Sequence, residues 1–583
     1  MKDLAKKYFE KTEHSVVFSI LVLVAAVVSF RGLPGQVTWL ERSLLYVLAF
    51  LGAWNIKSIL LEIRRRYSGI LDRIVLALVC LLSTFCETGA FFIVPRFLQI
   101  PFPVFFAVSL LWVSVIVLYL VCKSCHMIES LSRCREGKSF SWKESLIMVA
   151  VCVGLCMLCV YAFNPAITSM DSLDCLNYAY HLGEGPIPNG HPVFYLLLLR
   201  FFSSINGNLQ FLILVQAVYY ALVYTYGMNT LVQIGVPKKV CAGIYLLAGI
   251  GFNTIIQLAT LWKDIPFATS FLWLTILLVQ MCSRPEKYAK CVSWYVQYAV
   301  SAILTGLIRH NGLLPVIATM VLSLLLLREK KRLLVATLAV CLAITVISGP
   351  VYSRYQVYDV PGLKFYAMAN DIMNVYYFEG GDDKFMQVVN DVTDGDPENF
   401  NYNPYYTKVA RNNMDHYSIP EFLDIYLYTW LHYPKTMLRG FLARNSVIWS
   451  IGRAFGEERG CVNYLGEYRN PDLGEPYPER VPNAATEIVT KISEKLTSNG
   501  MIYTFYWKTA IYNLLMVIGL LFILLRYRRN FLSMALPFVP IAVNVFALLM
   551  TSGWPDYRYY WPSFLTASML LPYTAIVLAG KKR

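Results

Sequence analysis

The sequence predicts an all-α polytopic membrane protein with about 14 transmembrane helices. The chain has 583 residues, of which 57% are hydrophobic and only 15% are charged, and its mean hydropathy is +0.50. Soluble domains carry nearer a quarter of charged residues, so this composition excludes a water-soluble enzyme. Apolar runs of about 17 to 22 residues recur from end to end, and each can cross a hydrocarbon layer of roughly 30 Å as a helix.

The apolar runs and the basic clusters between them place the expected spans. These cover residues 15–30, 45–62, 74–93, 103–121, 146–163, 210–232, 241–259, 266–282, 292–308, 311–327, 333–349, 508–526, 532–551 and 562–579. With the N-terminus in the cytoplasm, every strong basic cluster falls on the cytoplasmic side. The net charge of +14 is therefore mostly a topology signal that indicates anionic lipid, and not nucleic acid, as its neighbour.

This topology divides the chain into four expected regions. The long segment 350–506 lies outside and holds about 20 of the 37 acidic residues against about 14 basic ones, so we expect a mixed, mainly helical extracytoplasmic domain. Within the first outer loop, the apolar stretch 192–202 is too short to cross and predicts an interfacial or re-entrant helix. The regions are an N-terminal four-helix membrane module (1–143), a membrane core (144–349) with its first extracytoplasmic loop (164–208), the extracytoplasmic domain (350–506) and the last three transmembrane helices (507–583).

Polar residues gather at one predicted depth. Ionisable groups in or beside a bilayer are costly and usually functional, and here they all map to the outer side, so we expect them to meet in one cavity that opens away from the cytosol. They occur as Asn164-Pro165 with Asp171, Asp174 and Asn189-Gly190-His191-Pro192, as Trp262-Lys263-Asp264, as Arg309-His310-Asn311-Gly312 and as Asp556-Tyr557-Arg558-Tyr559.

The first of these strings contains the candidate catalytic residues. The segment from Thr168 to Asp174 predicts the start of a helix that continues through Tyr180 until Gly183 ends it. Asp171 and Asp174 would then share a face near the helix N-terminus. Either one of them caps the helix, or a carboxylate held at the membrane surface removes a proton from an acceptor hydroxyl. The polar content of this loop favours the second interpretation.

The cationic residues of the other strings are candidate phosphate ligands. Lys263 could pair with Asp264 at the surface, which would contribute little to stability, or could meet an anionic headgroup. Arg309 and Arg558 could be interfacial anchors, but outward-facing arginine is unexpected under the positive-inside bias, and its fork suits phosphate. We predict that Lys263, Arg309 and Arg558 bind the donor phosphate. The residues predicted to bind the rest of the substrate are His191, Asp264, His310 and Asn311.

Taken together, these features resemble the GT-C superfamily of membrane glycosyltransferases. The shared features are many spans, a first outer loop with an early Asp171 and then His191-Pro192 before a short helix, and Arg558-Tyr559 ahead of a late span. The segment from Asn164 to Pro192, with Trp262-Lys263-Asp264, looks most like a largely uncharacterised bacterial family of this type. The resemblance covers roughly residues 145–350 and the last three spans, and leaves residues 1–143 outside it.

The resemblance implies a GT-C-like fold and transfer of a sugar from a polyprenyl-phosphate carrier, such as undecaprenyl phosphate, to a glycan, lipid or protein acceptor of the cell envelope. It further implies a multi-pass protein of the bacterial plasma membrane, with both termini cytoplasmic and the active site extracytoplasmic. The family's general base corresponds to Asp171, with Asp174 in reserve, and its phosphate contacts to Lys263, Arg309 or Arg558. Several members have adjacent acidic residues or Asp-x-Asp where this chain has Asp-x-x-Asp, so a requirement for divalent metal (Mg²⁺ or Mn²⁺) stays open.

The chemistry of glycosyl transfer fits the same residues. The reaction needs a base for the incoming oxygen and stabilisation of the departing group. A lipid phosphate whose charge is matched by Arg or Lys leaves without a strong general acid. Three alternatives stay open: a polymerase that joins lipid-linked repeat units, a flippase or transporter of a lipid-linked substrate, and a non-catalytic assembly or scaffold protein. A flippase should place its ionisable residues near mid-membrane, whereas here they collect at one face.

The cysteines do not predict a disulfide scaffold. Most of the 14 lie in spans or on the cytoplasmic side, where a thiol behaves as a small apolar residue. Only Cys175 and Cys461 map outside, and the sequence leaves open whether they pair.

Overall fold

The protein is almost entirely helical. The one sheet found among the described residues is a pair of two-residue parallel strands. Seven helices are long and apolar enough to cross a membrane, or up to nine if each of two bent helix pairs is one span. The expected all-α membrane protein is confirmed at this level, while the total of about 14 spans stays a prediction. The computed structural model describes residues 17–27, 39–93, 101–131, 139–360, 365–398, 400, 402, 414–451, 482–498, 500–552 and 556–580.

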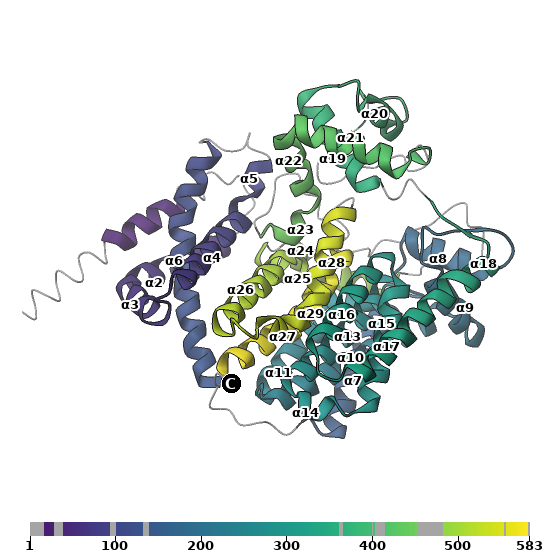
Figure 1. Ribbon diagram of the computed structural model, residues 1–583, viewed down its shortest axis with the longest axis horizontal. Helices are drawn as coiled ribbons and strands as arrows, with labels where there is room; N and C mark the ends of the chain where they lie inside the picture. The colour runs from purple at the N-terminus through teal and green to yellow at the C-terminus, as the bar shows by residue number, and fades with distance from the viewer. Residues whose placement is uncertain are drawn as a thin grey trace, which may run out of the picture.

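The N-terminal helices form a separate group beside the main bundle, at the left of Figure 1. Helix α6 packs against α2, α3 and α4, and the group docks through α4 on α26 and through α6 on α29. The expected span 45–62 is a broken helix pair with a bend of 69°. At the break, the Asn55 amide donates to the Leu51 carbonyl oxygen (2.8 Å), a local bond that competes with regular helix. The bounds are Val17–Val27 for the first helix, then α2 Trp39–Trp54, α3 Ile56–Arg66, α4 Ile70–Thr88, α5 Ala90–Ile93 and α6 Phe102–Leu131.

The main bundle is arranged around α13, which packs against α10, α15 and α29. The expected span 241–259 is broken by 56° between α11 and α12. A Cβ on Gly251 would collide with the Leu247 carbonyl oxygen, so the bend depends on this glycine. The bounds are α7 Trp142–Ala162, α10 Leu209–Ile234, α11 Lys238–Ile244, α12 Phe252–Leu258, α13 Asp264–Ser283, α14 Pro285–Tyr288, α15 Val292–Ile308, α16 Leu313–Leu326, α17 Lys330–Val346, α26 Ala510–Arg526, α27 Phe531–Ala535, α28 Val539–Thr551 and α29 Tyr557–Ala579.

Two short helices of the loop 164–208 confirm the local predictions made there. Helix α8 spans Met170–Tyr180, and Gly183 follows with φ of +95°, a conformation that favours glycine. Helix α9 spans Val193–Ile205 and packs against α8. Between them, β1 (Ile187–Pro188) pairs in parallel with β2 (Val357–Tyr358), which follows α18 (Tyr352–Arg354).

A helical unit at the top of Figure 1 has its own apolar core. Its helices come from the segment 350–506, and its buried side chains include Ile372, Val389, Phe422 and Met437. In contrast, α24 packs against α7, and α23 packs against α26 and α29. The bounds are α19 Tyr366–Glu379, α20 Met386–Thr393, α21 Ile419–His432, α22 Pro434–Arg444, α23 Ser446–Trp449, α24 Ala484–Ser498 and α25 Gly500–Trp507.

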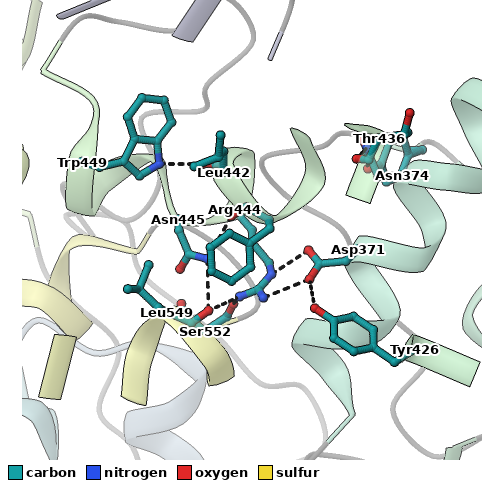
Figure 2. A network of polar contacts seen from close by, with 12 residues as sticks. Asp371, Asn374, Tyr426, Thr436, Leu442, Arg444, Asn445, Trp449, Leu549 and Ser552 are labelled. Carbon is teal, nitrogen blue, oxygen red and sulfur yellow. Dashed lines mark hydrogen bonds and ion pairs between the residues drawn. The ribbon is translucent and has the colours of Figure 1, made fainter. Parts of the chain in front are cut away.

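A buried ion pair within this helical unit contacts the main bundle through its arginine (Figure 2). The Arg444 guanidinium contacts the Asp371 carboxylate through two nitrogens, at 2.8 and 3.0 Å. It also donates to the carbonyl oxygens of Leu549 and Ser552, each at 2.9 Å, which satisfies carbonyls at the C-terminal end of α28. Tyr426 donates to the same carboxylate at 2.8 Å. One contact between the two parts therefore depends on a guanidinium that is removed from water.

The basic turns and the outer helical unit lie at opposite ends of the bundle. Figure 1 shows α11, α14 and α27 at the lower end and α19 to α22 at the upper end. Helix α11 begins with Lys238-Lys239, and α27 follows the basic run Arg526 to Arg529. These basic turns and the helices α19 to α22 therefore lie far apart in the fold, and the side of the membrane on which each lies stays a prediction. Cys175, in α8, is a buried thiol, whereas Cys461 lies outside the described residues.

Candidate functional site

The ends of α8 and α29 meet through an ion pair between Asp171 and Arg558. The Arg558 Nη2 lies 2.7 Å from the Asp171 Oδ2, and the Arg558 Nε lies 2.9 Å from the Asp556 Oδ2. Asp556 is the N-cap of α29 and accepts from the Arg558 backbone N–H at 3.1 Å. The cap therefore positions the first turn of α29, and that turn presents its guanidinium to α8. The fold thus brings together two residues that are almost 390 positions apart in the sequence.

A second ion pair also lies beside Tyr559. The Arg309 Nη1 lies 2.5 Å from the Asp264 Oδ1. The guanidinium carbons of Arg309 and Arg558 are 4.4 and 4.9 Å from the centre of the Tyr559 ring, within cation–π distance. Arg558 also donates from Nη2 to the Tyr559 hydroxyl oxygen at 3.0 Å. This tyrosine therefore connects two charged pairs into one continuous cluster.

The third group contains His191, Lys263 and Asp174. The Lys263 Nζ lies 2.7 Å from the His191 Nδ1. An ammonium can only donate, so Nδ1 accepts and the ring proton sits on Nε2, which is 3.9 Å from the Asp174 Oδ2. The surface pair considered between Lys263 and Asp264 is not formed, because each residue turns to a different partner.

A hydrogen bond between two backbone segments places these groups at the same end of the bundle. Ile167 accepts from the Leu261 N–H at 3.1 Å, which places the chain before α8 beside the chain before α13. The Trp262 indole N–H donates to the Ser169 hydroxyl at 2.6 Å, and its ring lies 5.1 Å from the Arg558 guanidinium carbon. Helices α8, α13 and α29 consequently all start at the cluster, with the positive ends of their dipoles beside its carboxylates.

The carboxylates of the cluster differ in the solvent exposure of their side chains. The side chains of Asp171 and Asp174 are 31% and 35% exposed, whereas that of Asp264 is 2% exposed. Only the first two are open to an incoming molecule, so Asp264, predicted to bind substrate, positions Arg309. Neither open carboxylate occupies the N-cap of α8, because Ser169 does. The N-cap position is therefore held by Ser169, while Asp171 lies in the first turn of α8.

The two remaining predicted residues lie in the turn between α15 and α16. The Asn311 amide donates to the Asn544 side-chain oxygen at 3.1 Å, which ties this turn to α28. His310 interacts electrostatically with Lys263, His191 and Arg309. All nine predicted site residues therefore belong to this region, although Asn311 makes a contact between helices.

Three participants were not among the predicted site residues. Tyr559 contacts both arginines, Asp556 pairs with Arg558, and the Trp262 ring packs on Arg558. Each lies next to a predicted residue in its polar string. An aromatic residue beside an arginine at a helix start was the available signal, because such rings stack on guanidinium groups.

The described residues do not form a metal centre. Within these parts of the chain, no group of three or more His, Cys, Asp or Glu is placed to hold a metal ion. Asp171 and Asp174 instead contact different partners, Arg558 and His191. The residues present thus do not fit the divalent metal that the resemblance left open, and we derive no step through one.

We expect His191 to make folding stability depend on pH. Burial, followed by the nearby Lys263 ammonium, lowers the pKa of His191. As the pH falls, the unfolded chain therefore binds a proton at His191 before the folded chain does. The free energy of unfolding decreases as the pH drops below about 6.5, the pKa of a histidine in the unfolded chain. Lowering the pH from about 7.5 to about 5 should decrease the melting temperature of the wild type more than that of His191→Gln.

The exposed His432, in α21, provides the matched control for this experiment. His432→Gln should retain the pH dependence of the wild type. Equal pH dependence in His191→Gln and the wild type would contradict the prediction.

Comparison with known proteins leaves the site to be interpreted on its own geometry. No family model, no curated protein and no solved structure matches this chain.

Proposed function

We propose that this protein is a glycosyltransferase that moves a sugar from a polyprenyl-phosphate carrier to an acceptor hydroxyl, with Asp171 as the general base. The observation that carries the proposal is the pairing of an accessible carboxylate with a cationic fork, at 2.7 Å between Asp171 and Arg558. A base for the acceptor and a charge for the departing phosphate are the two groups that this reaction needs.

The proposed reaction begins when the donor phosphate replaces the Asp171 carboxylate at Arg558. A donor phosphate and the Asp171 carboxylate compete for the same Nη2 donor, so phosphate binding frees Asp171. The acceptor hydroxyl then passes its proton to Asp171 while its oxygen bonds to the anomeric carbon of the sugar. The bond from that carbon to the phosphate oxygen breaks, and the electron pair leaves on the lipid phosphate. Arg558 stabilises that charge through the donors that Asp171 released.

The other residues have supporting roles in this proposal. Arg309, held by Asp264, adds a second positive charge beside Tyr559. Lys263 and His191 extend the cationic side of the site toward Asp174, which is the reserve candidate for the base. The lipid tail would lie along the spans, and sugar transfer would take place at the extracytoplasmic face of a bacterial plasma membrane. The position of the basic turns at the far end of the bundle supports that orientation.

Incubation of the purified full-length protein with a radiolabelled polyprenyl-phosphate sugar and candidate acceptors tests the function. Release of free polyprenyl phosphate with transfer of the label is the expected result. Release of a pyrophosphate carrier from lipid-linked repeat units would instead identify a polymerase. Movement of the lipid across the bilayer without bond cleavage would identify a flippase, and either outcome would overturn the proposal.

Truncation of Arg558 should weaken donor binding. A hydrogen bond to a charged group contributes about 1.5–3 kcal/mol, so Arg558→Ala should raise the KM for the lipid-phosphate donor by about 10- to 100-fold. Arg200→Ala is the matched control, because Arg200 lies in α9 and donates to the Tyr180 carbonyl oxygen, outside the cluster. An unchanged donor KM in Arg558→Ala would remove the phosphate assignment.

A further inference from the structure

A pocket of about 300 Å³ opens beside the Arg309 side of the cluster. Its polar lining comes from Asn189, Arg309, His310, Ser348, Tyr352, Ser353 and Asp359, and aliphatic side chains of α15, α16, α17 and β2 complete the wall. A volume of this size is at the lower end of the range for small-molecule sites. Of its polar residues, only Arg309 and His310 belong to the predicted site.

The polar wall is built by two segments that are distant in sequence. The β1·β2 pairing aligns Ile187 with Val357, and the Asn189 N–H donates to the Tyr358 carbonyl oxygen at 2.8 Å. The Asn189 amide then donates to the Asp359 Oδ1 at 3.2 Å. An amide and a carboxylate are thereby held side by side at the pocket, on backbone that hydrogen bonds keep in register.

Tyr352 anchors the opposite end of the same segment. Its hydroxyl accepts from the Phe194 N–H at 3.2 Å, at the start of α9. The segment that carries Tyr352, Ser353 and Asp359 is therefore tied to the first outer loop at both ends. Such ties keep the pocket's polar groups in place before a ligand arrives, which lowers the entropic cost of binding.

The charges of the lining distinguish among ligand classes. Arg309 is already paired with Asp264 at 2.5 Å, and Asp359 brings a negative charge into the wall. A phosphate would be repelled by that carboxylate, and a hydrocarbon would leave the polar wall unpaired. A ring with hydroxyl groups fits both surfaces, because hydroxyls bond to Asp359 and Asn189 while C–H faces pack on the aliphatic side chains.

The side-chain oxygen of Asn189 gives independent support for a ligand with hydroxyl groups. The side-chain oxygen of Asn189 is buried and accepts no hydrogen bond within the described structure. An acceptor removed from water without a donor is unfavourable. A ligand hydroxyl in this pocket is a donor of the kind that would satisfy it, whereas a phosphate has only acceptor oxygens at neutral pH.

We propose that this pocket binds a neutral pyranose ring of the substrate, with Asn189 and Asp359 recognising neighbouring hydroxyls. The inference rests on the proposed function, since it names the sugar subsite of the same region. The ring belongs either to the acceptor or to the glycosyl group of the donor, and the two share the chemistry that the pocket recognises.

Saturation-transfer NMR on the full-length protein tests the proposal. The protein is held in a detergent without a sugar headgroup, and the probes are the methyl glycosides of glucose, galactose, mannose and N-acetylglucosamine. At least one glycoside should receive saturation from the wild type, and Asp359→Ala should reduce that signal by about tenfold. Asp359→Asn, which keeps the shape of the side chain, covers the case in which the alanine variant does not fold.

The matched control is Asp424→Ala, which removes an exposed carboxylate paired with Lys384 in the outer helical unit. That variant should bind as the wild type does. Absence of saturation with all four glycosides, or a signal equal to that of the wild type in both Asp359→Ala and Asp359→Asn, would overturn the proposal. The readout requires no turnover, so binding without sugar transfer would refute the proposed function alone, and transfer without glycoside binding would refute this inference alone.

Kinetics then distinguish the two sources of the ring. A raised KM for the acceptor alone in Asp359→Asn assigns the pocket to the acceptor, and a raised KM for the donor alone assigns it to the donor sugar. Unchanged KM values for both substrates would contradict a sugar subsite here.

Discussion

The Asp171→Asn variant should lose sugar transfer, with kcat reduced by about 10²- to 10⁴-fold, while its expression and membrane insertion stay at wild-type levels. An asparagine keeps the shape of the side chain and can still accept from Arg558 through its amide oxygen. It cannot take the proton of an acceptor hydroxyl. Release of polyprenyl phosphate from a radiolabelled donor, at saturating concentrations of both substrates, measures the loss.

The matched control is Asp72→Asn. Asp72 also pairs with an arginine, Arg528, at 3.2 Å, but near the basic turns. The same substitution there should leave turnover unchanged. Near-wild-type turnover in Asp171→Asn would withdraw the base assignment, and Asp174→Asn, assayed beside it, would show whether the reserve carboxylate carries that role.

The Arg444→Ala variant should lower the free energy of unfolding by about 3–5 kcal/mol. Arg444 and Asp371 are both fully buried, and Figure 2 shows the guanidinium between the carboxylate and the end of α28. Its removal leaves an uncompensated buried charge and two carbonyl oxygens, those of Leu549 and Ser552, without this donor. Chemical denaturation of the full-length protein in mixed micelles measures the change.

Two further variants separate charge burial from packing. Lys435→Ala removes an exposed cation from the same helix, α22, and should change stability by no more than about 0.5 kcal/mol. The double variant Arg444→Met with Asp371→Leu replaces the pair by apolar side chains and should recover much of the loss. A single Arg444→Ala variant as stable as the wild type would show that the pair is not what holds the helical unit to α28.

The helices of the first outer loop were predictable because their signals are local. The polar run before Asp171 and the glycine at position 183 bracket α8, and the short apolar run after Pro192 becomes α9. In each case a few neighbouring residues decide the backbone conformation, through capping, glycine geometry and apolar length. The approximate positions of the membrane helices follow in the same way from apolar runs.

The breaks within two expected spans were not predictable from hydropathy. Asn55 and Gly251 lie inside apolar runs whose average hydropathy they hardly change. Their effect on the backbone comes from a side-chain hydrogen bond to Leu51 and from a contact that only glycine permits. Both effects depend on atoms at close range, which an average over about 19 residues does not register.

Which charged residues form pairs could also not be predicted from the sequence. Lys263 and Asp264 are neighbours and of opposite sign, yet adjacent residues at a helix start point in different directions. Lys263 therefore reaches His191, and Asp264 reaches Arg309. Asn189 and Asp359, at the proposed sugar pocket, are 170 positions apart, and nothing in either string indicates the other.

By itself, the amino-acid sequence determined that this chain is a helical membrane protein and that its polar strings occur where helices start. Only the tertiary structure decided that Asp171 faces Arg558, that Tyr559 contacts both arginines, and that Asn189 meets Asp359 at a pocket. The physical reason is the distance along the chain over which each interaction acts. Hydropathy and capping act over a few residues, whereas an ion pair depends on which helix ends the packing of the whole bundle brings together.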